Sequence, residues 1–431
     1  MSIDAIKRVL LIAYYYPPFP MIGALRPHGL RKYLPEHGWD VLVLTTRLES
    51  SRDDRSVIET DYRDILSQWK KRLGFSSSRG LHDQLGLPVS SSPNRRLLHT
   101  RVIDAAKVLI TYPDSMKGWV PFASKILPRL ASTNKIDAII STSPPISCHM
   151  IGAKAKQITG APWIADFRDL WVRDPVMNLL MTRILKTSDE LVTVSPALAK
   201  RLEEAYPERP TSCITNGFDD SDFLAHSSSL TKRFSITHTG RMYEGKRDPS
   251  SLLSVVRELA DTGEVRRDDI DLRFYGPIDP FLPAMVHRFG LEDICEIHES
   301  VPRTEALALQ ARSQLLLLLE WGVPGEQGIF TGKLFEYLGS KRPILSVGQD
   351  PGIASILKET SAGTQTSNLE ELRRYIRNAY LEFKRNGFVS YLGKDQEISK
   401  YNHSEMAARF AGELNRLTKR ATCEQSIAIE H

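Results

Sequence analysis

Apolar residues occur along this chain in short runs, and the runs alternate with longer segments in which apolar positions recur at helical spacing. The first run, RVLLIAYY (8–15), is followed by an amphipathic segment (24–39) and then by a second run, DVLVLTT (40–46). Short apolar runs separated by helical segments are typical of a parallel sheet covered by helices on both faces. The pattern therefore predicts an α/β fold built from strand–helix–strand units.

The alternation occurs in two successive series, separated by the polar, linker-like stretch 224–233. In the first series we predict strands at 8–15, 40–46, 137–144, 161–167, 190–196 and 210–216. In the second we predict strands at 234–240, 270–276, 294–301, 314–320 and 343–348, with helices at 249–263, 280–291, 303–313 and 333–340. Two α/β series of similar size in 431 residues predict two doubly wound, Rossmann-like parallel-sheet domains facing each other across a cleft.

The predicted N-terminal domain covers 1–228 and contains a Ser- and Arg-rich insertion at about 49–125, with helices at 58–72 and 99–111. The second domain covers 229–400. A C-terminal helix (about 402–419) and a frayed tail make up 401–431, and the option that this helix returns to the N-terminal domain is left open.

Net charge and the positions of the cysteines limit the kinds of partner, metal site and cellular location that fit this chain. A net charge of +5, from 57 basic and 52 acidic residues, is too small to indicate nucleic acid. Four scattered cysteines without a CxxC pair predict a reducing, cytoplasmic location and no zinc site. No apolar run is long enough for a membrane span. Basic residues in the insertion could contact the inner face of the plasma membrane, although a solvated surface is favoured. They are Lys70, Lys71, Arg72, Arg95, Arg96 and Arg101.

The stretch GEQGIFTGKLFEYLGSKRPILSV (325–347) carries the most specific chemistry. It is no phosphate-binding P-loop, because Gln327 and Leu334 stand where that motif needs a glycine and a Ser or Thr. Thr331 and Gly332 instead lead into Lys333 at a helix start, where free amides and the helix dipole attract anions. One turn on, Glu336 could bind vicinal hydroxyls, so we predict a phosphate-and-sugar clamp.

Ligands of open parallel sheets bind beyond the carboxyl ends of the strands, so residues that follow predicted strands are further candidates. Arg241 and Lys246 follow the first strand of the second domain and could hold two phosphates. Gly276 follows the next strand, and Gly23 precedes the first helix of the chain. Surface charge is the alternative for the two cations.

Several of these segments together resemble one protein family. They are YYYPPFPMIG with LRKYLPEHGWDVLVLT, VTVSPALAKRL, ITNGFD, THTGRMYEGKR, SVPRTEALALQARSQLLLLL and TGKLFEYLGSKRPIL. In this order they resemble retaining glycosyltransferases of family 4, with the GT-B fold, from bacterial polysaccharide biosynthesis. The resemblance implies a UDP- or GDP-sugar donor held by the second domain and a glycan or lipid-linked sugar acceptor bound by the first. It also implies transfer that needs no metal or other cofactor.

By position, the resemblance assigns Arg241 and Lys246 to the donor diphosphate and places Gly23 beneath it from the other domain. Glu336 matches the second glutamate of the family's E-x7-E motif, which holds the ribose, and Val301 would contact the base through its backbone.

The sequence departs from the family at two places. Gly328 stands at the first glutamate of E-x7-E, with Glu326 two positions away, and the family's usual histidine is replaced within ADFRD (165–169). The candidates near the reacting sugar are then Asp166, Arg168, Asp169 and His149. A buried Asp–Arg pair that fixes the loop is an equal alternative in ADFRD, and a structural role is the favoured one for His149.

Two other functions remain open at this point. A nucleotide-sugar 2-epimerase would use the same clamp without an acceptor. A catalytically inactive GT-B scaffold subunit is the other alternative, and the feature that supports it is the glycine at position 328 in place of the family's glutamate.

Overall fold

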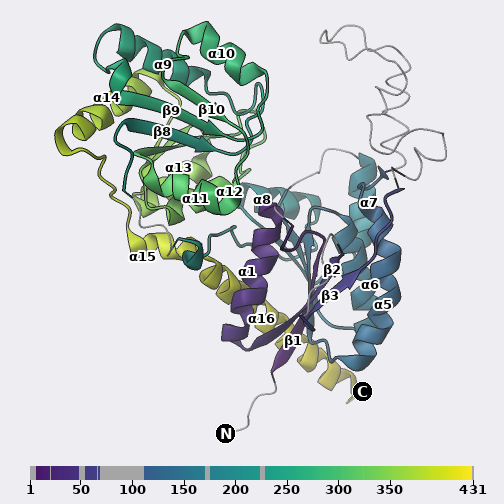
Figure 1. The fold of residues 1–431 in the computed structure, drawn as a ribbon. Coiled ribbons are helices and arrows are strands. Elements are labelled where there is room, and N and C mark those ends of the chain that lie inside the picture. Colours follow the sequence, from purple (N-terminus) through teal and green to yellow (C-terminus); the bar gives the residue numbers. More distant parts are fainter. Residues whose placement is uncertain are drawn as a thin grey trace. The chain divides into compact units, whose positions relative to one another are not determined.

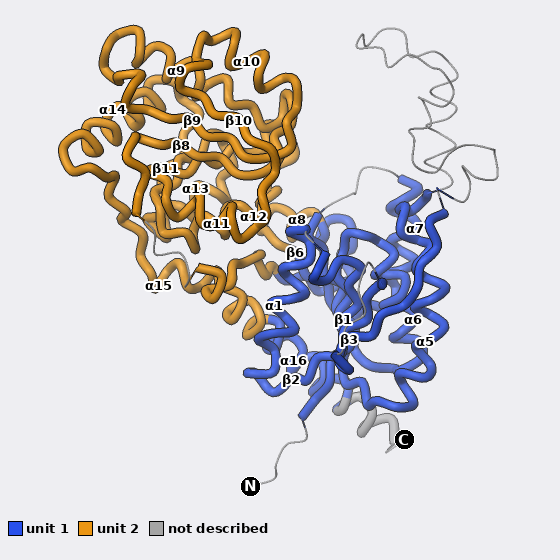
Figure 2. Tube along the Cα trace, in the orientation of Figure 1, with its two compact units in different colours: residues 1–193, 202–212, 410–431 blue, residues 194–201, 213–409 orange. Residues whose placement is uncertain are grey.

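Two separate parallel sheets, each flanked by helices, make up the computed structural model of this chain (Figure 1). The structure describes residues 6–19, 21–47, 54–65, 67, 111–169, 175–223, 229–323 and 325–429, without the side chains of 422 and 424–429. The chain divides into two compact units (Figure 2): unit 1 holds 1–193, 202–212 and 410–431, and unit 2 holds 194–201 and 213–409. The six basic residues proposed for membrane contact and the predicted helix 99–111, apart from Thr111, lie outside the described residues.

Unit 1 contains a sheet in the order β3-β2-β1-β4-β5-β6-β7. Its strands are β1 (Lys7–Ala13), β2 (Trp39–Thr46), β3 (Val57–Thr60), β4 (Ala138–Ser143), β5 (Trp163–Phe167), β6 (Glu190–Thr193) and β7 (Thr211–Cys213). β1 pairs in parallel with β2 on one side and β4 on the other, with Val9 opposite both Val41 and Ala138. Chain order therefore reverses at β1, which is the switch point of a doubly wound sheet.

The helices of the first half are α1 (Leu25–Tyr33), α5 (Val120–Thr133), α6 (Ser147–Thr159), α7 (Pro175–Leu185) and α8 (Pro196–Ala205), with the short 3-10 helix η1 (Ile22–Ala24) before α1. Figure 1 shows α5 and α6 on one face of the sheet and α1 on the other. The long helix α16 (His403–Ile429) starts in unit 2, and its residues from Phe410 onward are part of unit 1.

Two sequence predictions are wrong in this half. The helix predicted from 58 is a strand at its start, because Val57–Thr60 pairs in parallel with β2 along Val43–Thr46. Residues 421–429, predicted to lie in a frayed tail, continue α16 to Ile429 through a segment without glycine or proline. Both errors have the same origin, since the pattern of apolar residues is local. It does not show that the edge of β2 is free to pair with another strand, or that a helix continues beyond its apolar face.

Unit 2 contains a second parallel sheet in the order β10-β9-β8-β11-β12-β13. Its strands are β8 (Phe234–Thr239), β9 (Ile270–Tyr275), β10 (Cys295–His298), β11 (Leu315–Leu319), β12 (Ile344–Val347) and β13 (Gly363–Thr366). Its helices are α9 (Ser250–Asp261), α10 (Phe281–Phe289), α11 (Arg303–Arg312), α12 (Gly332–Gly339), α13 (Pro351–Thr360), α14 (Leu369–Asn386) and α15 (Asp395–Ile398). Every strand and helix predicted for this half is confirmed, and the elements from α13 to α15 were not predicted.

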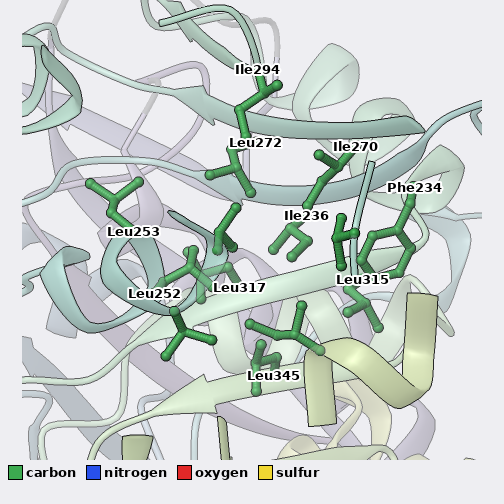
Figure 3. Packing of buried hydrophobic residues seen from close by; sticks show 14 of the residues in the cluster. Phe234, Ile236, Leu252, Leu253, Ile270, Leu272, Ile294, Leu315, Leu317 and Leu345 are labelled. Atoms are coloured by element: carbon green, nitrogen blue, oxygen red, sulfur yellow. The ribbon is translucent and has the colours of Figure 1, made fainter. Parts of the chain in front are cut away.

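The central strand β11 explains why this sheet is buried on both faces. Leu315, Leu317 and Leu319 pack with α9 and with β8, β9 and β12 residues such as Leu345 (Figure 3). Leu316 and Leu318 point to the opposite face and pack with α12 and α13. Because successive side chains alternate between faces, an unbroken leucine run fits a strand with helices on both sides.

Candidate functional site

Helix α12 and the loop before it lie at the carboxyl edge of the unit 2 sheet. Thr331 is the N-cap of α12, and its hydroxyl accepts a hydrogen bond of 3.1 Å from the amide of Lys333. Leu334 and Phe335 are fully buried in the core on this face of the sheet. The cap and the apolar residues together fix where the helix begins, and with it the position of Lys333.

Glycines at the ends of β8 and β9 make room for the Lys333 side chain. A Cβ on Gly240 would overlap Cε of Lys333 and come within 2.9 Å of its Nζ. A Cβ on Gly276 would lie 2.5 Å from the carbonyl oxygen of Gly240. Gly240 also has φ +106°, a conformation that favours glycine. The predicted candidates Gly276 and Lys333 are therefore brought together through Gly240.

Lys333 is a buried cation. Its side chain makes no hydrogen bond or ion pair with the residues that the structure describes, and only 6% of its surface is exposed. Burial, together with the nearby charge of Arg247, lowers the pKa of Lys333 to about 7, although Glu336 acts in the opposite direction. An anion bound here would restore the full charge of the ammonium group.

Arg247 is a second buried cation in this cluster, and the sequence analysis missed it. It is 9% exposed, and its guanidinium carbon lies 5.3 Å from the ring centroid of Trp321 and 5.5 Å from that of Tyr243. A tight turn, in which the amide of Arg247 donates to the carbonyl of Tyr243 at 2.9 Å, directs this side chain inward. Spacing along the chain carries no signal for that direction.

The predicted pair Arg241 and Lys246 is exposed in this structure. Lys246 lies over the ring of Trp321 with its Nζ 4.6 Å from the centroid, and Arg241 lies 5.9 Å from the ring of Tyr243. Both follow β8 as expected, and the two rings that they contact are those that Arg247 also contacts. Their role in binding a diphosphate stays a prediction.

Glu336 lies one turn into α12 and is bound by Arg303. The Nε of Arg303 donates to Oε1 of Glu336 at 2.9 Å, and an ion pair of 2.9 Å joins the same guanidinium to Asp222. Burial tends to lower the pKa of Arg303, but Glu336 and Asp222 outweigh it and raise the pKa above its ordinary value. Val301 lies two residues before Arg303, and its backbone contact with a base stays a prediction.

The two residues discussed for the first glutamate of the family motif have other environments. Gly328 has φ +84°, and a Cβ there would lie 2.6 Å from Cβ of Ala197 and 2.8 Å from Oγ of Ser195. Glu326 accepts a hydrogen bond of 2.7 Å from the indole of Trp321. A side chain at position 328 would therefore need the surrounding backbone to move, and Glu326 is already engaged.

In unit 1, Arg168 joins three loops at the carboxyl edge of the sheet. Its guanidinium donates to the carbonyl oxygens of Ser143 (2.9 Å), Pro144 (2.8 Å) and Gly23. A Cβ on Gly23 would lie 2.8 Å from this guanidinium. Burial lowers the pKa of Arg168. These contacts give Arg168 a structural role, and the position of Gly23 beneath a diphosphate stays a prediction.

Asp166 is completely buried and pairs with Arg26 of α1. Its carboxylate accepts from Nε and Nη2 of Arg26 at 3.0 and 2.8 Å, and from the hydroxyl of Thr142 at 2.7 Å. The buried Asp–Arg pair considered from the sequence is therefore present, but its arginine is Arg26 and not Arg168. Asp169 is exposed at the end of the same segment.

His149 is fully buried inside unit 1. Its Nδ1 lies 2.8 Å from the hydroxyl of Ser141, which also accepts from the indole of Trp163 at 2.8 Å. The imidazole ring lies 4.4 Å from the ring of Phe167, and burial lowers the pKa of His149 to about 3. The histidine is neutral and enclosed by aromatic side chains.

The described residues contain no group of three or more His, Cys, Asp or Glu side chains placed to hold a metal ion. Within the same part of the chain, every helix is too short or too polar to cross a bilayer.

Comparison with known proteins agrees with the architecture. Residues 24–217 match the family model described as "Glycosyl transferase 4-like domain". Curated protein sequences give no significant match to the chain.

Several solved structures share the fold over nearly the whole chain. Sucrose-phosphate synthase from Thermosynechococcus elongatus is 14% identical with a TM-score of 0.63, covering 96% of this chain and 100% of its own. Anabaena Alr3699/HepE in complex with UDP is 14% identical with a TM-score of 0.61, covering 95% and 100%. The α,α-trehalose 6-phosphate synthase from Burkholderia multivorans is 11% identical with a TM-score of 0.61, covering 96% and 99%. The fold is therefore GT-B, as predicted.

Proposed function

We propose that this GT-B chain, whose residues 24–217 match a glycosyltransferase domain, transfers a sugar from a UDP- or GDP-sugar to a glycan or lipid-linked sugar. The observation that carries the proposal is the buried ammonium group of Lys333 at the start of α12, against the glycine at the end of β8. Burying an ion without a partner is costly unless a ligand supplies the opposite charge. A nucleoside diphosphate has that charge, and one of the similar structures, that of Alr3699/HepE, is a complex with UDP.

In this proposal the residues of unit 2 stabilise the leaving group. As the bond between the anomeric carbon and the diphosphate breaks, negative charge develops on the phosphate oxygen. Lys333, Arg247 and the first amides of α12 are fixed in advance, so they favour that charge without rearranging. Arg241 and Lys246 add to the positive potential, and Glu336 binds ribose hydroxyls with its oxygens that Arg303 leaves available.

Retention at the anomeric carbon, a role in cell-surface polysaccharide synthesis and independence of metal ions complete the proposal and rest on the sequence resemblance. We propose a cytoplasmic protein whose acceptor approaches from unit 1. Removal of divalent cations with EDTA should leave nucleotide binding unchanged.

The first test is a thermal-shift series with UDP, GDP, ADP, TDP and CMP. We expect one diphosphate to raise the melting temperature of the wild-type protein and of Lys358→Met, which removes an exposed lysine of α13. The same nucleotide should leave the melting temperature of Lys333→Met unchanged. If no nucleotide stabilises the wild-type protein, the proposal is wrong.

The inactive scaffold is the second candidate, because Gly328 leaves no place for a glutamate side chain. A donor sugar incubated with the protein separates the options. Release of the nucleotide indicates transfer to water or acceptor, a changed sugar on an intact nucleotide indicates the 2-epimerase, and binding without either reaction indicates the scaffold.

A further inference from the structure

The loop 325–331 has lost the family glutamate at Gly328, but it is bound by an acidic group from elsewhere in unit 2. The amide of Gly328 donates a hydrogen bond of 2.5 Å to Oδ2 of Asp350. This contact joins the loop after β11 to the loop after β12. Hydrogen bonds from an amide to a carboxylate are among the stronger ones in proteins, so the contact restrains a glycine-rich segment that would otherwise be flexible.

Asp350 is itself held from two sides. Its Oδ1 caps α13 by accepting from the amide of Gly352 at 2.9 Å, and its own amide donates to Oε2 of Glu320 at 2.7 Å. Glu320 is 5% exposed and also accepts from Ser346 (2.6 Å) and from Gln365 (2.7 Å). The chain of contacts therefore runs from the buried end of β11 through Asp350 to the loop.

The apolar packing indicates the same attachment. Phe330 is 7% exposed, and a Cβ on Gly352 would lie 2.5 Å from its ring. A Cβ on Gly348 would overlap the carboxylate of Glu320. Burial raises the pKa of Glu320, while its three donors favour the ionised form. Glycines at both places let the carboxylate and the phenyl ring reach their partners.

We propose that Glu320 and Asp350 form a positioning relay that fixes the loop 325–331, and through it the start of α12, before any ligand binds. The relay makes no contact with the ligand. It holds Thr331 and Lys333 in the geometry that receives the diphosphate, and this part of the inference rests on the proposed function. Where the family has a glutamate at position 328, this chain has Gly328, and a carboxylate from the end of the neighbouring strand, Asp350, holds the backbone of the loop.

Asp350→Ser tests the relay, because serine can still cap α13 but has no second oxygen for the amide of Gly328. We expect hydrogen exchange of 325–331 in the ligand-free protein to accelerate about tenfold or more, and UDP, or whichever diphosphate binds, to bind about tenfold more weakly. Glu320→Gln should give the same change with a smaller amplitude. Asn368→Ser alters the cap of α14 in the same unit and should change neither measurement.

The outcomes are distinct. Unchanged exchange of 325–331 in Asp350→Ser overturns the relay, whatever nucleotides do. Faster exchange with unchanged diphosphate affinity overturns the positioning role. If the wild-type protein binds no nucleotide, the proposed function fails, and faster exchange still supports the anchoring of the loop by Asp350.

Discussion

Charged residues lie at the carboxyl edges of both sheets, but they differ in whether the protein itself supplies their binding partners. In unit 1, Arg168 is bound by backbone carbonyls, and Asp166 is bound by Arg26 and Thr142. In unit 2, Lys333 is 6% exposed and has no such partner among the described residues, and Arg247 lies close enough to lower its pKa. The first arrangement is complete in itself, whereas in the proposed function the second receives its counter-ion from the bound diphosphate.

The presence or absence of a counter-ion within the protein indicates which buried charges are structural and which are candidates for ligand binding. A buried charge that the protein neutralises contributes mainly to stability, because removing one partner leaves the other unpaired. A buried charge that the protein leaves without a counter-ion lowers stability and is available to a ligand. The sequence favoured a ligand role for the Lys333 loop and left a structural Asp–Arg pair as an equal alternative in ADFRD, and the contacts show that pair between Asp166 and Arg26.

The largest expected effect is the loss of stability on removing the Asp166–Arg26 ion pair at the carboxyl edge of the unit 1 sheet. Asp166→Asn leaves Arg26 buried opposite a neutral amide, so we expect the free energy of unfolding to fall by about 3–5 kcal/mol. Urea denaturation at pH 7 measures this loss. The exposed Glu36→Gln in the same unit should change stability by roughly 0.5 kcal/mol or less. A stable Asp166→Asn protein that binds donor normally and transfers no sugar would instead identify Asp166 as catalytic.

The next largest effect is the pH dependence that Lys333 at the carboxyl edge of the unit 2 sheet should produce. Below pH 7 Lys333 is charged in the folded protein, and above it the amine loses its proton although the unfolded chain keeps its own up to about 10.5. The cost of burying Lys333 is therefore fully present below pH 7 and disappears as pH rises toward the unfolded value. In the proposed function the diphosphate binds the charged ammonium, so affinity should fall by up to about tenfold per pH unit above 7.

Titration calorimetry between pH 7 and 9 measures this slope, a range in which a terminal phosphate with a pKa of about 6 stays ionised. Lys333→Arg keeps its charge and should show a flat profile. An equal slope in Lys333→Arg would mean that another group controls binding.

The smallest effect distinguishes two adjacent cations. Arg247→Met should weaken diphosphate binding by about tenfold, as expected for one charged contact in a buried site. Lys246→Met removes an exposed charge and should weaken it by roughly threefold or less, with most of that loss vanishing in high salt. Calorimetry at low and high salt compares the two variants. The reverse order would favour the assignment made from sequence spacing over the one made from burial.

Much of the fold could be predicted because it depends on local pattern. The leucine run of β11 reads as a strand buried on both faces, and it is one. The glycine loop ahead of α12 was expected to begin a helix near Lys333, and Gly332 is the first residue of that helix. β3 could not be predicted in the same way, since Val57–Thr60 is a strand only because the edge of β2 is available to pair with it.

The sequence by itself determined the alternation of strands and helices, the carboxyl edge of each sheet, and the residue types available there. These follow from periodicity and from chain order, which are local or topological. Only the tertiary structure decided that Arg26 pairs with Asp166, that Arg247 points inward beside Lys333, and that Asp350 holds Gly328. Each depends on where distant segments meet and how much water they exclude, and burial converts the same side chain from a solvated charge into a structural pair or a binding group.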